Sequence, residues 1–287
     1  MSIDLHSGFT LALGGGGARG WAHIGVARSL ATHRLVPSRI VGTSMGAAIG
    51  AALAAGRTPD EILEGAARYQ VYRLVRRRAR FALFDPRPLV ARMEADLGDP
   101  LIEDLPTPLG ISTYDLVTGR PTLITSGPLA QALERSIAVP LFFPPCPDGS
   151  CVWTDAGPWE SMPVSLAREW APDLPVVGVH VDAPKPPFLA SRLAATLLRQ
   201  TAVRLGTGIV GDPLTARRYL ALLAQRWADP VVWLAPDILI APRLGVTNAL
   251  QFSRIGPMVE RGERATEEVL SVHLSEASGR GRSRRAA

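Results

Sequence analysis

Short apolar runs alternate along the chain with longer segments in which apolar residues recur every third or fourth position. The runs Thr10–Leu13 and Arg39–Thr43 are predicted to be buried strands. Residues 18–30, between them, carry the helical spacing, and a second helix, rich in alanine and glycine, is predicted from Met45 to Gly56. A third helix is predicted to begin at residues 58–61, Thr-Pro-Asp-Glu, which form a capping box with proline at the first helical position.

This order of strands and helices predicts an α/β fold in which helices cover both faces of a central, mostly parallel sheet. A chain of 287 residues that is 47% hydrophobic can bury one large core, so we expect a single domain over residues 8–272. Two helices are expected within residues 186–227, and the small, basic segment 273–287 is expected to be a disordered tail. Further strands are predicted at Leu109–Tyr114, Pro121–Thr125, Val152–Trp153, Val176–Val181 and Ile238–Ala241.

Charge and hydropathy narrow the kind of partner. The formal net charge of +5 favours an anionic surface, but no nucleic-acid-binding motif accompanies it. The start of the chain lacks a basic leader region and Met45–Gly56 is too short to span a bilayer, so we expect a cytoplasmic protein.

Residues 68–81 have the pattern of a basic amphipathic helix. A solvated helix packed on the domain is the favoured interpretation, and peripheral contact with an anionic membrane is the alternative. The oligomeric state stays open.

The first chemical signal is Gly42-Thr43-Ser44-Met45-Gly46, between the second predicted strand and the second predicted helix. Small residues on both sides of the serine let the backbone turn sharply and present the hydroxyl, as a nucleophile elbow requires. The helix that follows favours negative charge near Ser44. The alternative is a serine that merely caps the helix on a glycine-rich turn.

The second signal is a glycine loop, in which Gly14 to Gly17 are followed by Ala18, Arg19 and Gly20, between the first strand and the first helix. Outward-pointing N–H groups in such a loop form an anion site, which ester cleavage can use as an oxyanion hole. A tight packing turn and a dinucleotide-binding loop are the alternatives. A dinucleotide-binding loop requires an acidic residue at the end of the second strand, and here that strand ends in GTSMG, which offers a serine instead. A P-loop requires a lysine followed by serine or threonine after the glycines, and this chain has none there.

A serine nucleophile needs a base. Among the histidines only His180, near the end of a predicted strand, is a credible triad member, although a core role suits it better. The other candidate is Asp155, which follows a short apolar stretch and precedes a glycine turn; a carboxylate that caps this turn is the ordinary interpretation. Cys146 and Cys151 flank an Asp-Gly turn signal, and two free thiols are favoured over a disulfide.

Together these segments resemble the patatin-like phospholipase family, in its single-domain bacterial form, from about Phe9 to about Leu270. The family's glycine box resembles LALGGGGARGWAHIGV, its G-x-S-x-G elbow resembles GTSMG, and its aspartate box resembles Asp155-Ala156-Gly157. The segments STYDLVTGR, SIAVPLFFPP and MPVSLARE add further similarity. All three boxes occur in the family's order.

The resemblance implies a three-layer α/β/α hydrolase of lipid acyl esters, phospholipase A- or lysophospholipase-like, that needs no metal or other cofactor. Ser44 would be the nucleophile and Asp155 the base of a dyad without histidine. A soluble short-chain carboxylesterase and a catalytically silent lipid- or nucleotide-binding module are the alternatives. Ala156 stands where the family usually has glycine, and a left-handed backbone there would cost about 1 kcal/mol more for alanine. The implied oxyanion-hole residues are Gly15, Gly16, Gly17 and Arg19, with motif support from Gly14, Gly20, Gly42, Gly46 and Gly157.

Overall fold

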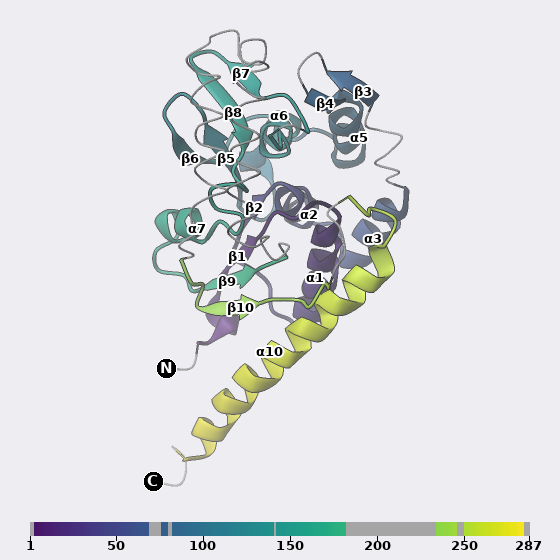
Figure 1. Ribbon diagram of the computed structural model, residues 1–287. Coiled ribbons are helices and arrows are strands. Elements are labelled where there is room, and N and C mark those ends of the chain that lie inside the picture. The colour runs from purple at the N-terminus through teal and green to yellow at the C-terminus, as the bar shows by residue number, and fades with distance from the viewer. Residues whose placement is uncertain are drawn as a thin grey trace, which may run out of the picture.

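The computed structural model describes residues 3–68, 76–79, 82–140, 142–181, 234–245 and 250–283 (Figure 1). The strands of its main sheet are β1 (Thr10–Leu13), β2 (Arg39–Thr43), β5 (Leu109–Asp115), β6 (Arg120–Ile124), β7 (Cys146–Asp148), β8 (Cys151–Asp155), β9 (Val176–Val179) and β10 (Ile238–Ile240). Within the described residues the sheet has the order β10-β9-β1-β2-β5-β8-β7, with β6 also paired to β5. The strands from β10 to β5 are parallel, and β6, β7 and β8 add antiparallel pairs. The predicted α/β fold with a mostly parallel central sheet is therefore confirmed.

Both faces of the central strands β1, β2, β5 and β9 are buried. Leu11, Leu13 and Ile40 join the main core, while the intervening Ala12 and Val41 join a smaller core on the opposite face. This alternation follows from the two-residue period of a strand. In Figure 1, α7 covers one face of the central strands, and α1 and α2 cover the other. The helices are η1 (Leu5–Ser7), η2 (Gly17–Trp21), α1 (Ala22–Thr32), α2 (Met45–Ala54), α3 (Pro59–Arg68), α5 (Arg87–Leu97), η3 (Ile102–Asp104), α6 (Leu129–Ser136), α7 (Val164–Trp170) and α10 (Ile255–Ser283).

The local signals in the sequence correspond to real contacts. The Thr58 hydroxyl accepts a hydrogen bond from the Glu61 N–H at 3.2 Å, and the Glu61 carboxylate accepts one from the Thr58 N–H at 2.8 Å. This is the predicted capping box at the start of α3. Cys146 and Cys151 are free thiols, because the β7–β8 register pairs the first with Trp153 and the second with Asp148.

The helix expected over residues 68–81 is wrong where the structure describes this segment. Arg76–Ala79 forms strand β3, which pairs antiparallel with β4 (Ala82–Asp85). The end of β4 is held by tertiary contacts, since the Phe84 N–H donates to the Phe142 carbonyl at 2.9 Å. Tertiary contacts of this kind can override a helical spacing of charges. The two helices expected in residues 186–227 lie outside the described residues.

The last helix runs further than expected. The expected disordered tail, residues 273–287, is helical as far as Ser283, where α10 ends. Once the first turns of a helix are fixed by packing, each added residue costs little, and Leu274, Glu276 and Ala277 are good helix formers. In the part of the chain that the structure describes, no helix is long and apolar enough to cross a membrane.

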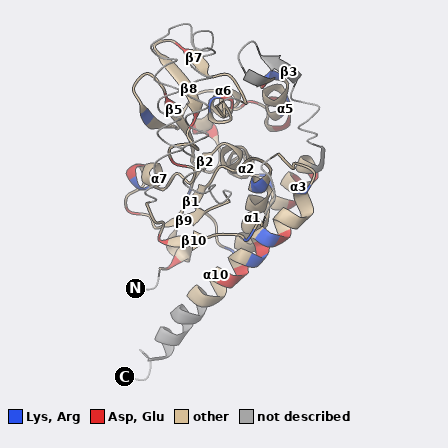
Figure 2. Ribbon diagram, in the orientation of Figure 1, with Lys and Arg blue, Asp and Glu red and all other residues tan. Residues whose placement is uncertain are grey.

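Helix α10 crosses α1 at very short range. A Cβ atom added to Gly25 of α1 would clash with the backbone of Val259, and one added to Gly262 of α10 would clash with the carbonyl of Ala22. The ion pair of Arg28 with Glu263, at 2.6 Å, and the hydrogen bond between the His33 ring and the Glu267 carboxylate, at 2.9 Å, flank this crossing. Figure 2 shows the charged residues gathered on the stretch of α10 that runs beside α1. Glycine at both positions lets the two backbones touch, and this contact sets the position of α10.

Gly262→Ala should therefore lower the free energy of unfolding by about 2 kcal/mol, because the obstacle is backbone that cannot rotate away. Gly256→Ala, in the same helix, is the control: nothing lies within 4 Å of its added Cβ, so it should be neutral or stabilise by up to about 1 kcal/mol. Urea denaturation of the purified variants measures both. Equal effects of the two substitutions would contradict the close crossing.

Candidate active site

Ser44 stands between β2 and α2 in an unusual backbone conformation. Its φ of 53° and ψ of −119° place it outside the regions that a residue with a side chain ordinarily adopts. Such a conformation costs about 1–3 kcal/mol and persists only where the surrounding structure imposes it. Its side chain makes no capping hydrogen bond to α2, so the interpretation of Ser44 as an ordinary helix cap does not hold.

Two glycines make this turn possible. A Cβ on Gly42 would lie 2.5 Å from the backbone of Ala47, and a Cβ on Gly46 would clash with the carbonyl of Leu13 at the end of β1. The first turn of α2 thus rests directly on the ends of two parallel strands. The strand–turn–helix context that the sequence predicts for GTSMG is present.

A buried serine that the sequence interpretation missed holds the elbow from behind. The Ser44 N–H donates to the Ser136 hydroxyl at 2.9 Å, and that hydroxyl donates to the Ser112 carbonyl at 2.8 Å. Ser136 is fully buried at the end of α6. The only signal for it was its place at the start of SIAVPLFFPP, a segment of recognised similarity without an assigned role.

The glycine loop lies against Ser44. A Cβ on Gly15 would be 3.4 Å from the Ser44 Cβ. The Gly14 and Gly15 N–H groups are already used, since they donate to the carbonyls of Val179 and Ser161 at 3.0 Å each. Gly16 and Gly17 line the same cavity as Ser44, and in the described part of the chain their N–H groups form no hydrogen bond. Of the three expected oxyanion donors, Gly15 thus has its N–H engaged, and Gly16 and Gly17 retain theirs.

Arg19 does not line this cavity. It is buried in η2, and its Nε donates to the Val181 carbonyl at 2.6 Å. Val181 in turn lies beside Gly16, where an added Cβ would be 2.9 Å from the Val181 side chain. The guanidinium therefore links the segment after β9 to the glycine loop, and it lies outside the cavity that Ser44 lines.

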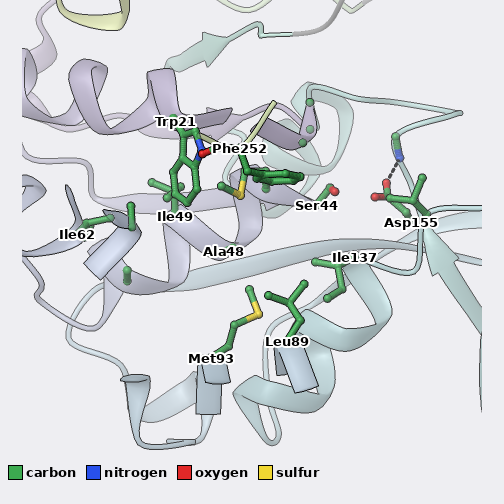
Figure 3. A pocket seen from close by; sticks show the side chains of 18 of the residues that line it. Trp21, Ser44, Ala48, Ile49, Ile62, Leu89, Met93, Ile137, Asp155 and Phe252 are labelled. Atoms are coloured by element: carbon green, nitrogen blue, oxygen red, sulfur yellow. Dashed lines mark hydrogen bonds between the residues drawn. The ribbon is translucent and has the colours of Figure 1, made fainter. Parts of the chain in front are cut away.

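Asp155 is the last residue of β8 and is brought to the site by antiparallel pairing with Thr113 of β5. Its N–H donates to the Ala138 carbonyl at 3.1 Å, and its Oδ1 accepts the Gly157 N–H at 2.6 Å. The turn-capping role expected of an ordinary aspartate is thus real. The same carboxylate lines the cavity that holds Ser44, and Figure 3 shows the two side chains pointing toward one another. Both are nearly inaccessible, with 8% of Ser44 and 2% of Asp155 exposed.

Alanine fits at position 156. Among the described residues, the only non-glycine residues with positive φ are Arg34, Ser44 and Asp99. Ala156 therefore needs no left-handed backbone, and its methyl group is buried in a small core with Tyr114 and Leu116. The departure from the family's usual glycine imposes no strain on the aspartate turn.

Histidine takes no place beside Ser44 in the described structure. His180 follows β9, its N–H donates to the Ile240 carbonyl, and it does not line the cavity. His23, which had no predicted role, is fully buried in α1, and its Nε2 lies 2.7 Å from the Gly14 carbonyl. Burial lowers the pKa of His23 to about 4, so the ring is neutral near pH 7 and its Nε2–H donates to that carbonyl. His23 is thus a second support of the glycine loop.

The cavity has a volume of about 1270 Å³ and is lined mainly by apolar side chains from η2, α2, α3 and α5. Trp21 and Phe252 meet edge to face on one side, and Leu89, Met93 and Ile137 lie on the other (Figure 3). Its volume exceeds the common range of about 300–1,000 Å³ for small-molecule sites. Among the described residues, no three His, Cys, Asp or Glu side chains are grouped as metal ligands would be.

Comparison with known proteins identifies the family. The model of the patatin-like phospholipase family matches residues 11–168, more than half of the chain and the whole span from the glycine loop to the aspartate box. The chain belongs to the patatin-like phospholipase family. Membership agrees with the fold and with the three boxes that the sequence presents.

Relatives of this patatin-like protein extend the match. An uncharacterized NTE family protein of Mycobacterium tuberculosis is 34% identical over 182 residues, which are 60% of this chain and 46% of that protein. Another from the same organism is 30% identical over 291 residues, 91% of this chain and again 46% of the relative. The chain thus spans about half the length of these curated relatives. The crystal structure of VipD from Legionella pneumophila shares the fold, with a TM-score of 0.56 over 95% of this chain and 68% of VipD at 14% identity.

The neutral, buried His23 predicts a pH dependence of stability. Its pKa is about 4 in the folded protein, against 6.5 for an ordinary histidine, so unfolding takes up a proton between these two pH values. The free energy of unfolding should fall as the pH drops from 6.5 to 4, by up to roughly 3 kcal/mol from this group.

His23→Gln keeps a donor for the Gly14 carbonyl but cannot titrate. Comparing urea denaturation of the two proteins across this pH range isolates the histidine, because the titration of the carboxylates cancels. The difference in unfolding free energy should change steadily between pH 6.5 and 4, and a constant difference would contradict a buried neutral His23.

Proposed function

We propose that this patatin-like protein hydrolyses carboxylic esters of lipids through a Ser44–Asp155 dyad, in the manner of a phospholipase A or lysophospholipase. The observation that supports this most is that the strained elbow, the glycine loop and Asp155 all line one apolar cavity. Each feature has an ordinary structural explanation when taken alone. Their meeting at one cavity is what a serine hydrolase requires.

In the first half of the reaction, the Ser44 Oγ attacks the ester carbonyl carbon while the Asp155 carboxylate takes the hydroxyl proton. The carbonyl oxygen becomes negatively charged and is stabilised by the N–H groups of Gly16 and Gly17. The bond between the carbonyl carbon and the alcohol oxygen then breaks. Asp155 returns the proton to that oxygen, so a neutral alcohol leaves and the acyl group stays on Ser44.

In the second half, water attacks the acyl carbon and Asp155 takes one of its protons. The bond to the Ser44 Oγ breaks, the proton returns to that oxygen, and a carboxylic acid is released. Asp155 is again a carboxylate. A neutral His23 has no part in these transfers, since it contacts only the carbonyl side of the glycine loop.

The cavity favours a long acyl chain over a short one, because apolar walls of this extent gain little from a small substrate. The alternatives to this proposal are a soluble short-chain esterase and a catalytically silent binding module, and the experiments below distinguish them. Peripheral contact with an anionic membrane also stays a prediction, since most of residues 68–81 lies outside the described part or belongs to β3.

Ser44→Ala should abolish ester hydrolysis, a loss of at least about a thousandfold in kcat, because the covalent path is removed. The variant should stay folded, since the Ser44 N–H bond to Ser136 comes from the backbone. Chromogenic ester assays measure the loss, and a fluorophosphonate followed by mass spectrometry of the labelled peptide identifies the nucleophile. Labelling at another residue, or turnover by a folded Ser44→Ala protein, would overturn the mechanism.

Asp155→Asn should lower kcat by about a hundredfold or more with little change in KM or in unfolding midpoint. The amide oxygen can still accept the Gly157 N–H, so the turn is preserved while the proton acceptor is lost. Asp148→Asn, an exposed aspartate of the β7–β8 hairpin, is a matched control. If Asp155→Asn instead loses stability and keeps its turnover per folded molecule, Asp155 only caps the turn.

A further inference from the structure

Helix α2 presents a stripe of small residues to the cavity. Ser44, Ala48 and Ala52 are spaced four residues apart, which puts them on one side of the helix, and all three line the cavity. Ala48 and Ala52 are partly exposed there, whereas the neighbouring Ala47 and Ala51 are completely buried in the core. Together with Met45 and Ile49 of the same helix, which also line the cavity, this stripe forms a floor that begins at Ser44.

The facing wall has the matching spacing. Leu89, Met93 and Leu97 of α5 also recur every four residues and line the cavity. In Figure 3 the order across the cavity is Ser44, Ala48 and then Ile62 of α3, with Leu89 and Met93 on the facing side. Beyond Ala52 the lining becomes charged, with Arg57, Glu61, Glu64 and Asp96. The apolar path thus starts at the nucleophile, follows α2, and ends at polar groups.

We infer that the acyl chain lies along α2, and that Ala48 and Ala52 determine how long a chain the protein accepts. This inference rests on the proposed function and adds the course of the acyl group within it. Both alanines are places where a larger side chain would narrow the path, Ala48 one helical turn from Ser44 and Ala52 two turns from it. They are specificity-determining positions and take no part in the chemistry.

Helix geometry gives the scale. With a rise of about 1.5 Å per residue, Ala48 lies roughly 6 Å and Ala52 roughly 12 Å along the axis from Ser44. An extended chain with C–C bonds of about 1.5 Å advances roughly 1.3 Å per carbon. Ala48 is then level with about the fifth acyl carbon, and Ala52 with about the tenth.

The test compares kcat/KM for butanoyl, octanoyl and hexadecanoyl esters of one chromogenic alcohol. Ala52→Leu should lower the hexadecanoyl-to-butanoyl ratio at least about tenfold and leave the octanoyl-to-butanoyl ratio alone, because only the longest chain reaches it. Ala48→Leu should lower both ratios to a similar extent. The specific expectation is that leucine at position 48 excludes shorter acyl chains than leucine at position 52 does.

Ala95→Leu is the matched control, since Ala95 is on the exposed side of α5 and does not line the cavity. It should change neither ratio. Unfolding midpoints are measured for each variant, and if a leucine variant does not fold, the corresponding valine variant should show the same order of cut-offs. If the wild-type protein cleaves none of the esters, the proposed function fails. If it cleaves them and the Ala48 and Ala52 variants keep its ratios, the chain runs elsewhere and this inference alone is overturned.

Discussion

The positive φ of Ser44 is the constraint on which the rest of the site depends. A backbone that turns this sharply brings the start of α2 back onto the strands, and only glycine at positions 42 and 46 permits the contact. Because Gly46 rests on the carbonyl of Leu13, the end of β1 and the glycine loop that follows it are held beside the nucleophile. The same turn points α2 along the cavity. One strained residue thus positions the hydroxyl, the donors of the glycine loop and the floor of the acyl path relative to one another.

The environment changes in character with distance from Ser44. Apart from Asp155 and Ser161, the cavity close to it is apolar, and in the proposed mechanism such surroundings strengthen the interaction of a developing oxyanion with backbone N–H groups. The titratable groups other than Asp155 that line the cavity lie at its far end, on α3 and α5 and just before α3. His23 and Arg19 support the glycine loop from behind without facing the nucleophile. Apart from Asp155, the charged residues that line the cavity therefore lie away from Ser44, and the buried polar residues behind the glycine loop hold it in position.

Much of this could be predicted from the sequence, because the relevant signals are local. Buried strands such as Thr10–Leu13 are continuous apolar runs, and the elbow and glycine loop are short motifs at the ends of such strands. The hydrogen bonds of Ser136 and His23 could not be predicted, since each depends on a partner that only the tertiary structure brings near. Strand β3 was missed for a related reason. The spacing of its charged residues is typical of a helix, but antiparallel pairing with β4 makes the segment a strand.

The residues that hold Ser44 and the glycine loop in place come from distant parts of the sequence, so no short segment contains the whole site. The glycine box and the elbow lie within the first fifty residues, yet the Ser44 N–H is held by Ser136 and the Gly15 N–H by the Ser161 carbonyl. A fragment that ends before these residues would contain both motifs and neither restraint. Under the proposed mechanism, Ser44 therefore acquires its surroundings only when the chain has folded as far as Ser161, and a shorter chain carries both motifs without these restraints.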